Sequence, residues 1–253
     1  MRVLIVNDDG IEGRGLYALA EALSAEHTVT VVAPHTQKSG FSHSLSFHKT
    51  ITYAPYELGL KNVRSYSLTG TPCDCVKFAV DVLMKDAVPD IILCGINDDY
   101  NLGTDVVYSA TVNAALEGAL LGYPSVAVSI GREHAGDFTY PAEFVRKNLD
   151  ALLALKRTDT VCYSINFPSE KREEIKGIRF ATLGLRKFSD RYELRENKDG
   201  SGYLLLGEPI PMDNSSSSDV ELIREGYITI TPVRIQDTDF ELYERSTGEN
   251  ICL

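Results

Sequence analysis

Short apolar runs alternate with helical apolar spacing through the first two thirds of the chain. Strands are predicted at residues 3–6, 29–33, 51–53, 63–66, 90–94, 125–130 and 161–165. Helices are predicted after Gly10, after Pro72, from near Ser109 or Thr111, and over residues 144–155. Unbroken apolar runs are typical of strands that are covered on both faces. The alternation predicts a Rossmann-like, doubly wound and mostly parallel sheet, which is a three-layer α/β/α fold.

The pattern changes after about residue 171. Strands predicted at 178–183, 203–206 and 227–231 have no long helix between them, and residues 214–218 are a polar loop. We therefore predict one domain over residues 1–253, with a core over about 1–170 and a C-terminal β-hairpin extension over about 171–253. Strand-rich extensions of this kind are suited to pairing with another subunit.

Three polar segments follow predicted strands of the core. They contain Asp8 and Asp9, Ser39 within residues 35–46, and Asn97 within residues 95–103. Ligands of open parallel sheets bind at the carboxyl ends of the strands, so these segments are expected to converge. Adjacent buried carboxylates repel each other, and oxygen ligands suit a Mg²⁺-like or Mn²⁺-like ion. The alternative is an ordinary polar turn, with Asp capping the following helix.

Residues 109–111 precede an alanine-rich helix. The free N–H groups and the dipole of a helix N-terminus bind anions, although plain capping by Ser109 is the simpler interpretation. A phosphate between this helix and a cation at Asp8 and Asp9 would be polarised from two sides. That arrangement suits hydrolysis of a phosphate monoester.

Composition and charge limit the partners and the cellular compartment that we expect for this protein. The net charge of −11 argues against non-specific binding of nucleic acid, and we expect no duplex nucleic-acid partner. No apolar stretch is long enough to span a bilayer, and the N-terminus enters a strand rather than a signal peptide. The five cysteines are odd in number, which argues against a disulfide framework. We therefore expect reduced thiols and a cytoplasmic protein that does not bind membranes.

Motifs for other chemistry are missing from the sequence. Gly13 and Gly15 do not form GxGxxG after the first strand, and neither GxxxxGK[ST] nor GxSxG occurs. Cys73 and Cys75 form CxC without a histidine at zinc-ligand spacing. The five histidines show no ligand spacing, and His43 is the one that we expect near the site.

The sequence resembles the SurE survival-protein family of metal-dependent 5′/3′-nucleotidases. The matching stretches are VLIVNDDGI (3–11), VVAPHTQKSGFSHSLS (31–46), TGTPCDCVK (69–77), GINDDYNLGTDVVYSATVNAALEG (95–118) and GYITITP (226–232). They follow one another nearly from end to end of the chain. The resemblance implies a Rossmann-like core and a C-terminal extension that exchanges between subunits of a homodimer or homotetramer.

The resemblance also assigns roles to individual residues. One divalent metal per subunit, Mg²⁺ or Mn²⁺, is expected on Asp8, Asp9, Ser39 and Asn97. Of these, Asp8, Asp9 and Asn97 are the expected catalytic residues. The residues expected at the phosphate are Ser39, Gly40, Asn101, Ser109, Ala110 and Thr111.

Four positions depart from the family pattern. His43 replaces the usual Asn, Asp98 and Asp99 replace a small residue followed by Gly, and Ala110 replaces Gly. Extra carboxylates beside an anion site weaken anion binding unless they point away. The methyl group of Ala110 adds bulk where backbone N–H groups approach phosphate.

The predicted function is hydrolysis of nucleoside 5′- and 3′-monophosphates by a metal-dependent phosphomonoesterase. Water attacks phosphorus in line, and Asp8 or Asp9 orients or deprotonates it. An aspartyl-phosphate intermediate through Asp8 is a variant of this mechanism. Two alternatives remain open, namely a degenerate member that binds nucleotide without turnover and a signalling module resembling a receiver domain.

Overall fold

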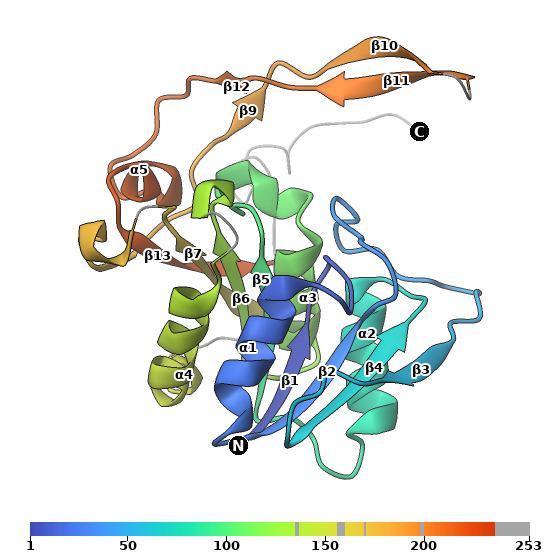
Figure 1. Ribbon diagram of the computed structural model, residues 1–253. Coiled ribbons are helices and arrows are strands. Elements are labelled where there is room, and N and C mark those ends of the chain that lie inside the picture. Colours follow the sequence, from blue (N-terminus) through green and yellow to red (C-terminus); the bar gives the residue numbers. More distant parts are fainter. Residues whose placement is uncertain (135–136, 156–159, 170, 198–199, 236–253) are drawn as a thin grey trace, which may run out of the picture.

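A nine-stranded sheet forms the centre of the computed structural model, which describes residues 1–134, 137–155, 160–169, 171–197 and 200–235. The strand order is β3-β4-β2-β1-β5-β6-β7-β13-β8 (Figure 1). The strands are β1 (Arg2–Val6), β2 (Thr28–Pro34), β3 (Tyr53–Tyr56), β4 (Val63–Leu68), β5 (Ile91–Asn97), β6 (Ser125–Ile130), β7 (Val161–Phe167), β8 (Ile178–Phe180) and β13 (Ile228–Arg234). The run from β4 to β7 is parallel, whereas β3 and β13 are antiparallel to their neighbours β4 and β7.

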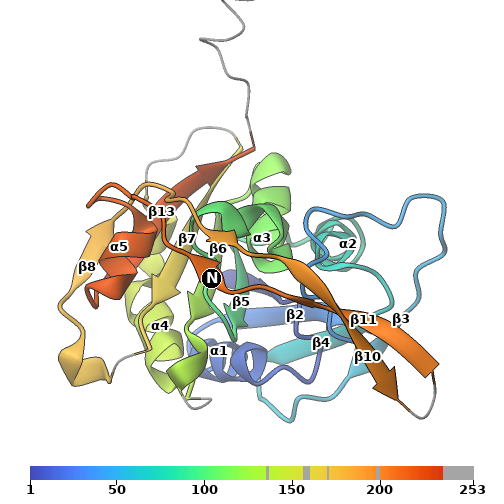
Figure 2. The ribbon, with the colours of Figure 1, turned by 90° about the horizontal axis from the view of Figure 1, so that it is seen from above.

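Helices cover both faces of the sheet, as the alternating pattern predicts. The helices are α1 (Arg14–Ser24), α2 (Pro72–Phe78), α3 (Ala110–Leu120), α4 (Thr139–Leu153) and α5 (Asp219–Arg224), and a π-helical turn (Ala79–Leu83) extends α2. Helices α1 and α4 lie on one face, and α2 and α3 lie on the other (Figure 2). Short 3₁₀ helices occupy Gly103–Val107, Arg132–His134 and Arg172–Glu174. Within the described part of the chain, no helix is long and apolar enough to cross a membrane.

The central strand β1 belongs to two hydrophobic cores. Val3 and Ile5 pack in the core that includes α1 and α4, and Leu4 and Val6 pack in the core that includes α2 and α3. All four side chains are fully buried, because alternate side chains of a strand point to opposite faces. The prediction of a strand covered on both sides is confirmed, and so is the three-layer fold.

Several element boundaries differ from those expected. Helix α4 begins at Thr139 rather than at residue 144, because a proline such as Pro141 is tolerated in the first turn of a helix. Strand β5 extends past Cys94 to Asn97, so Asn97 ends a strand instead of lying in a loop. Strand β3 starts at Tyr53, later than the predicted strand at 51–53. Helix α5 was not predicted, since its six residues are too few to show a period.

The segment after residue 171 has two parts. Strands β8 and β13 join the central sheet, so the predicted boundary near residue 170 divides the sequence but not the sheet. Between them, β10 (Arg191–Asn197) and β11 (Gly200–Leu206) form the expected β-hairpin, which projects from the body of the protein (Figure 1). At its base, β9 (Lys187–Phe188) pairs with β12 (Pro209–Ile210). Residues 236–253 of the predicted extension, including Cys252, lie outside the described residues.

Candidate metal and phosphate site

The chain reverses its winding direction between β1 and β5. From β1 the sheet grows through β2 to β4, and from β5 it grows through β6 to β7. At such a switch point, the connections that leave the two neighbouring strands run to opposite faces of the sheet, and ligands bind in the crevice between them. A cleft of about 690 Å³ lies there. It is lined by Asp8, Asp9, Gln37, Ser39, Gly40, Asn97, Asp98, Asp99, Tyr100, Asn101, Asp105, Tyr108, Ser109, Arg132, Arg186 and Phe188.

A closed turn presents the two carboxylates at the end of β1. The Asn7 side chain donates to the Gly10 carbonyl oxygen at 2.9 Å and accepts from the Gly10 N–H at 3.2 Å. Asn7 is fully buried, and Gly10 has a φ of 101°, a conformation that favours glycine. This clamp fixes the backbone of Asp8 and Asp9 between its two ends.

Burial makes the negative charges at this turn costly. Desolvation raises the pKa of Asp8, and the hydroxyl of Thr111, which donates to Asp8 Oδ1, opposes this shift. The pKa of Asp9 is raised to about 7, first by desolvation and then by the charges of Asp8 and Asp98. A pair of carboxylates that resists ionisation is a site where a cation is stabilising.

Two backbone hydrogen bonds hold the Ser39 segment over the cleft. The N–H of Lys38 donates to the carbonyl oxygen of Asp8 at 2.6 Å, and the N–H of Ser42 donates to that of Tyr108 at 3.1 Å. Between these anchors, Ser39 and Gly40 line the cleft and are exposed. The predicted approach of this segment to the end of β1 is therefore observed.

Asn97 lies across the cleft from this segment, at the end of β5. A register irregularity between β5 and β6 separates Cys94 from Asn97, and such bulges re-aim side chains. The Asn97 side chain donates to the Asp99 carbonyl oxygen at 2.9 Å, which leaves its own Oδ1 as an oxygen ligand. Of the two unusual acidic residues, Asp99 pairs with Arg132 at 2.8 Å, so its charge is partly neutralised.

The N-terminus of α3 is capped by Ser109 and reaches the cleft. Ser109 Oγ accepts from the Val112 N–H at 3.1 Å, so Ser109 is the N-cap, and it also lines the cleft. Ala110 and Thr111 are fully buried. The Thr111 hydroxyl contacts Asp8, so the helix supports a predicted metal ligand directly.

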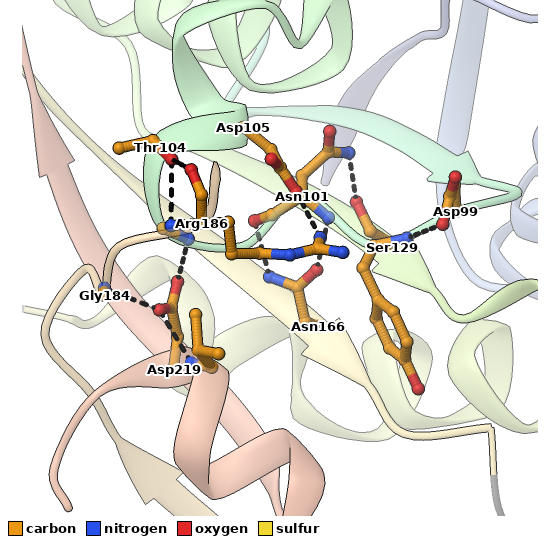
Figure 3. A network of polar contacts seen from close by, with 12 residues as sticks. Asp99, Asn101, Thr104, Asp105, Ser129, Asn166, Gly184, Arg186 and Asp219 are labelled. Atoms are coloured by element: carbon orange, nitrogen blue, oxygen red, sulfur yellow. Dashed lines mark hydrogen bonds and ion pairs between the residues drawn. The ribbon is translucent and has the colours of Figure 1, made fainter. Parts of the chain in front are cut away.

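Asn101 is held by two strand ends that sequence reasoning missed. Its N–H donates to Asn166 Oδ1 at 2.9 Å, and its side chain donates to Ser129 Oγ at 2.8 Å (Figure 3). Ser129 and Asn166 lie at the carboxyl ends of β6 and β7. Their position at the same sheet edge was the signal that could have found them.

The segment before the hairpin closes the far side of the cleft, which sequence reasoning also missed. Arg186 forms an ion pair with Asp105, and its guanidinium lies 5.2 Å from the ring centroid of Phe188 (Figure 3 shows Arg186 and Asp105). The side chains of Arg186 and Phe188 are half-buried in the cleft wall.

A second group of possible metal ligands lies beside α3, away from the cleft. Ligand atoms of His43, Cys73 and Glu117 lie within 4.8 Å of one another. Glu117 pairs with Lys77 at 2.6 Å and with His43 at 2.7 Å, and desolvation raises the pKa of the Cys73 thiol to about 12. These contacts form an ion-pair cluster around Glu117 of α3, whose carboxylate is buried. His43 thus contacts α3 and does not line the cleft, where it was expected to lie near the site.

The cleft residues fit a hard divalent cation. Asp8, Asp9, Ser39 and Asn97 offer only oxygen ligands, and the first two are carboxylates whose burial disfavours their charge. Mg²⁺ and Mn²⁺ prefer this ligand set and retain waters in the remaining positions.

Comparisons with known proteins agree with this geometry. The family model described as Survival protein SurE matches residues 3–190. The protein named 5′-nucleotidase SurE of Alkaliphilus metalliredigens is 36% identical over 252 residues, covering 99% of each chain. Its namesake from Synechococcus is 39% identical over 248 residues, covering 96% of this chain and 95% of the relative. The crystal structure of the SurE protein from Aquifex aeolicus superposes with a TM-score of 0.81 at 32% identity, covering 97% of this chain and 98% of that one. The chain therefore belongs to the SurE family.

Proposed function

We propose that this protein is a metal-dependent phosphomonoesterase that hydrolyses nucleoside 5′-monophosphates, and also 3′-monophosphates, to nucleoside and phosphate. The observation that supports this most strongly is the placement of Asp8 and Asp9 at the sheet switch point, in one cleft with the N-terminus of α3. The names of the relatives, 5′-nucleotidase SurE, support the same activity. The family match over residues 3–190 does not favour the receiver-like alternative.

Asp8, Asp9, Ser39 and Asn97 would hold one divalent ion, Mg²⁺ or Mn²⁺, per subunit. When bound, the ion neutralises phosphate charge and makes water more acidic. Thr111 fixes the orientation of Asp8 through its hydroxyl. Asp8 or Asp9 orients the attacking water and accepts its proton.

The phosphate would lie between the carboxylate pair and α3. Ser109 and Asn101 line the cleft there, and the backbone N–H groups of Ala110 and Thr111 begin the helix. N–H groups and hydroxyls at this position stabilise the equatorial oxygens as charge develops on them. Gly40, on the opposite segment, has no atom within 4 Å of a Cβ built on it, which leaves room for the ligand.

The test is phosphate release from a panel of nucleoside 5′- and 3′-monophosphates with Mg²⁺, Mn²⁺ or EDTA. Asp9→Asn should lower kcat/KM by roughly a thousandfold, because one metal ligand and one proton acceptor are lost. Asp98→Asn is the matched control, since Asp98 is an exposed carboxylate in the same cleft. We expect at most a few-fold change for the control.

The outcome separates the remaining alternatives. Absence of release from folded protein at every metal would contradict the proposal and favour a member that binds nucleotide without turnover. A stoichiometric burst of labelled phosphate trapped on Asp8 would favour the aspartyl-phosphate variant.

A second copy of this chain is the proposed partner, bound through the β10–β11 hairpin as a homodimer or homotetramer. The register places Tyr192 opposite Leu205 and Leu194 opposite Tyr203, so these four side chains share one face. Each of them is at least 51% exposed. A lone two-stranded hairpin with an exposed apolar face gains stability by packing on a partner.

Light scattering tests this assembly. Leu194→Glu should shift the mass toward the monomer, whereas Leu204→Glu places the same charge on the opposite face and should not. Equal masses for both variants and the wild type would contradict the assignment of this face.

We also propose a cytoplasmic location. Four cysteines, Cys73, Cys75, Cys94 and Cys162, are buried free thiols. Free thiols are typical of reducing compartments, and the proposed nucleotide substrates are found there. Fractionation of cells that express a tagged protein would test this location.

A further inference from the structure

The three sides of the cleft differ in chemistry. The β1 and β5 side carries Asp8, Asp9 and Asn97, and the phosphate side carries Ser109. The third wall comes from the chain after β8, where Arg186 Cζ lies over the Phe188 ring, 5.2 Å from its centroid. We call Asp8, Asp9 and Asn97 the floor of the cleft, and Arg186 and Phe188 its wall. The wall offers an aromatic and cationic surface beside the acidic floor.

We propose that Phe188 and Arg186 bind the base of the nucleotide, an inference that rests on the proposed nucleotidase function. Bases stack on aromatic rings and on guanidinium planes with little regard to their identity. A wall of this kind selects nucleotides over other phosphate monoesters without selecting one base.

The ion pair of Arg186 decides which part of the substrate it meets. Arg186 Nη1 contacts Asp105 Oδ2, so its charge is already balanced by a half-buried carboxylate. A neutralised guanidinium adds little attraction for a phosphate dianion, but its flat face remains available for stacking. Its role in the cleft is therefore that of a platform together with Phe188.

The wall is tied to the phosphate side through Asp105, which lies in the 3₁₀ helix Gly103–Val107. The Ser109 N–H donates to the Asp105 carbonyl oxygen at 3.0 Å, while the Asp105 carboxylate holds Arg186. Asp105 therefore contacts both Arg186 of the platform and Ser109, the N-cap of α3. This short separation suits a nucleoside monophosphate, in which a single sugar joins the base to the phosphate.

Backbone contacts fix the platform before substrate binds. Thr104 Oγ1 accepts from the Arg186 N–H at 3.0 Å and donates to the Arg186 carbonyl oxygen. The carboxylate of Asp219 accepts from the N–H groups of Gly103 and Gly184, each at 2.8 Å (Figure 3). Preorganisation of this kind lowers the entropy lost on binding.

The experiment compares AMP with glycerol phosphate, a monoester without a base. Phe188→Ala and the milder Phe188→Leu should raise the KM for AMP relative to that for glycerol phosphate by about tenfold, because one stacking contact is lost. Arg186→Lys keeps the charge but loses the plane, and it should shift the same ratio in the same direction. Lys187→Ala, the exposed neighbour on β9, is the matched control and should leave the ratio unchanged.

Equilibrium binding makes the test independent of turnover. Phe188→Leu should weaken adenosine binding about tenfold and leave inorganic phosphate binding within twofold of the wild type. Equal effects on adenosine and phosphate, or no effect on either, would overturn the assignment of the base to this wall. Weaker adenosine binding in Tyr108→Ala, with none in Phe188→Leu, would also overturn it, because the base would then lie at Tyr108, an exposed aromatic residue of the cleft. Failure of the wild type to hydrolyse any monoester would instead count against the proposed function.

Discussion

The cleft floor and the cleft wall are built in different ways. The floor residues Asp8 and Asn97 lie at the carboxyl ends of buried central strands, and Asp8 is supported by a helix through Thr111. The wall residue Phe188 belongs to a two-stranded pairing at the base of a projecting hairpin, and Arg186 lies two residues before it. Core packing therefore positions the floor, whereas a few polar anchors position the wall. We expect the floor to set chemistry and the wall to set substrate preference.

The largest structural effect is expected at Asp219, the main anchor of the wall. Asp219 is fully buried and accepts hydrogen bonds from the N–H groups of Gly103, Gly184 and Val220. Asp219→Ala leaves these donors unpaired and should lower the free energy of unfolding by about 3 kcal/mol. Thermal unfolding followed by circular dichroism measures this, and Asp219→Asn, which keeps one acceptor oxygen, should lose less. Equal stability of the alanine variant and the wild type would show that the wall needs no such anchor.

A smaller effect is expected at Thr111, which supports the floor. Thr111→Val keeps the shape but removes the hydroxyl that donates to Asp8. Loss of a hydrogen bond that orients a metal ligand should weaken Mn²⁺ binding by roughly tenfold. Isothermal titration measures the affinity. Thr229→Val, at another fully buried threonine, in β13, is the control and should bind as the wild type does. If both variants bind equally, the support of Asp8 by α3 is not functional.

A third effect is a pH dependence of stability. The pKa of Asp9 is raised from its ordinary value of 3.8 to about 7, so folded protein without metal binds more protons than unfolded protein between these values. Its stability should consequently fall as pH rises from about 4 to 7. Melting temperatures in EDTA would show this slope, and Asp9→Asn should reduce it. An identical slope in the variant would mean that ionisation of Asp9 does not lower the stability of the metal-free protein.

Sequence reasoning was effective for the floor. The apolar run of β1 has a clear pattern, and Asp8 and Asp9 follow it directly. Topology then brings Asn97 and the Ser39 segment to the same cleft, as the rule for open sheets requires. Fully buried strands give a strong signal, because nearly every side chain in them is apolar.

The wall was missed for physical reasons. Strand β9 has two residues, so it shows no alternation, and its role depends on contacts with distant residues. Thr104 and Asp219 anchor Arg186 and Gly184 across 82 and 35 positions of sequence. Periodicity carries no information about such pairs, so Arg186 could not be placed near Asp105 in advance. The contact of His43 with Glu117, instead of with the cleft, has the same origin.

The most direct test of the account is titration of the metal-free protein with Mn²⁺, followed by electron paramagnetic resonance. We predict one tight site per chain that is lost in Asp9→Asn and retained in Glu117→Gln, since Glu117 of α3 belongs to the ion-pair cluster with Lys77 and His43. Retention of the site in Asp9→Asn, with its loss in Glu117→Gln, would place the metal in that cluster and contradict the account.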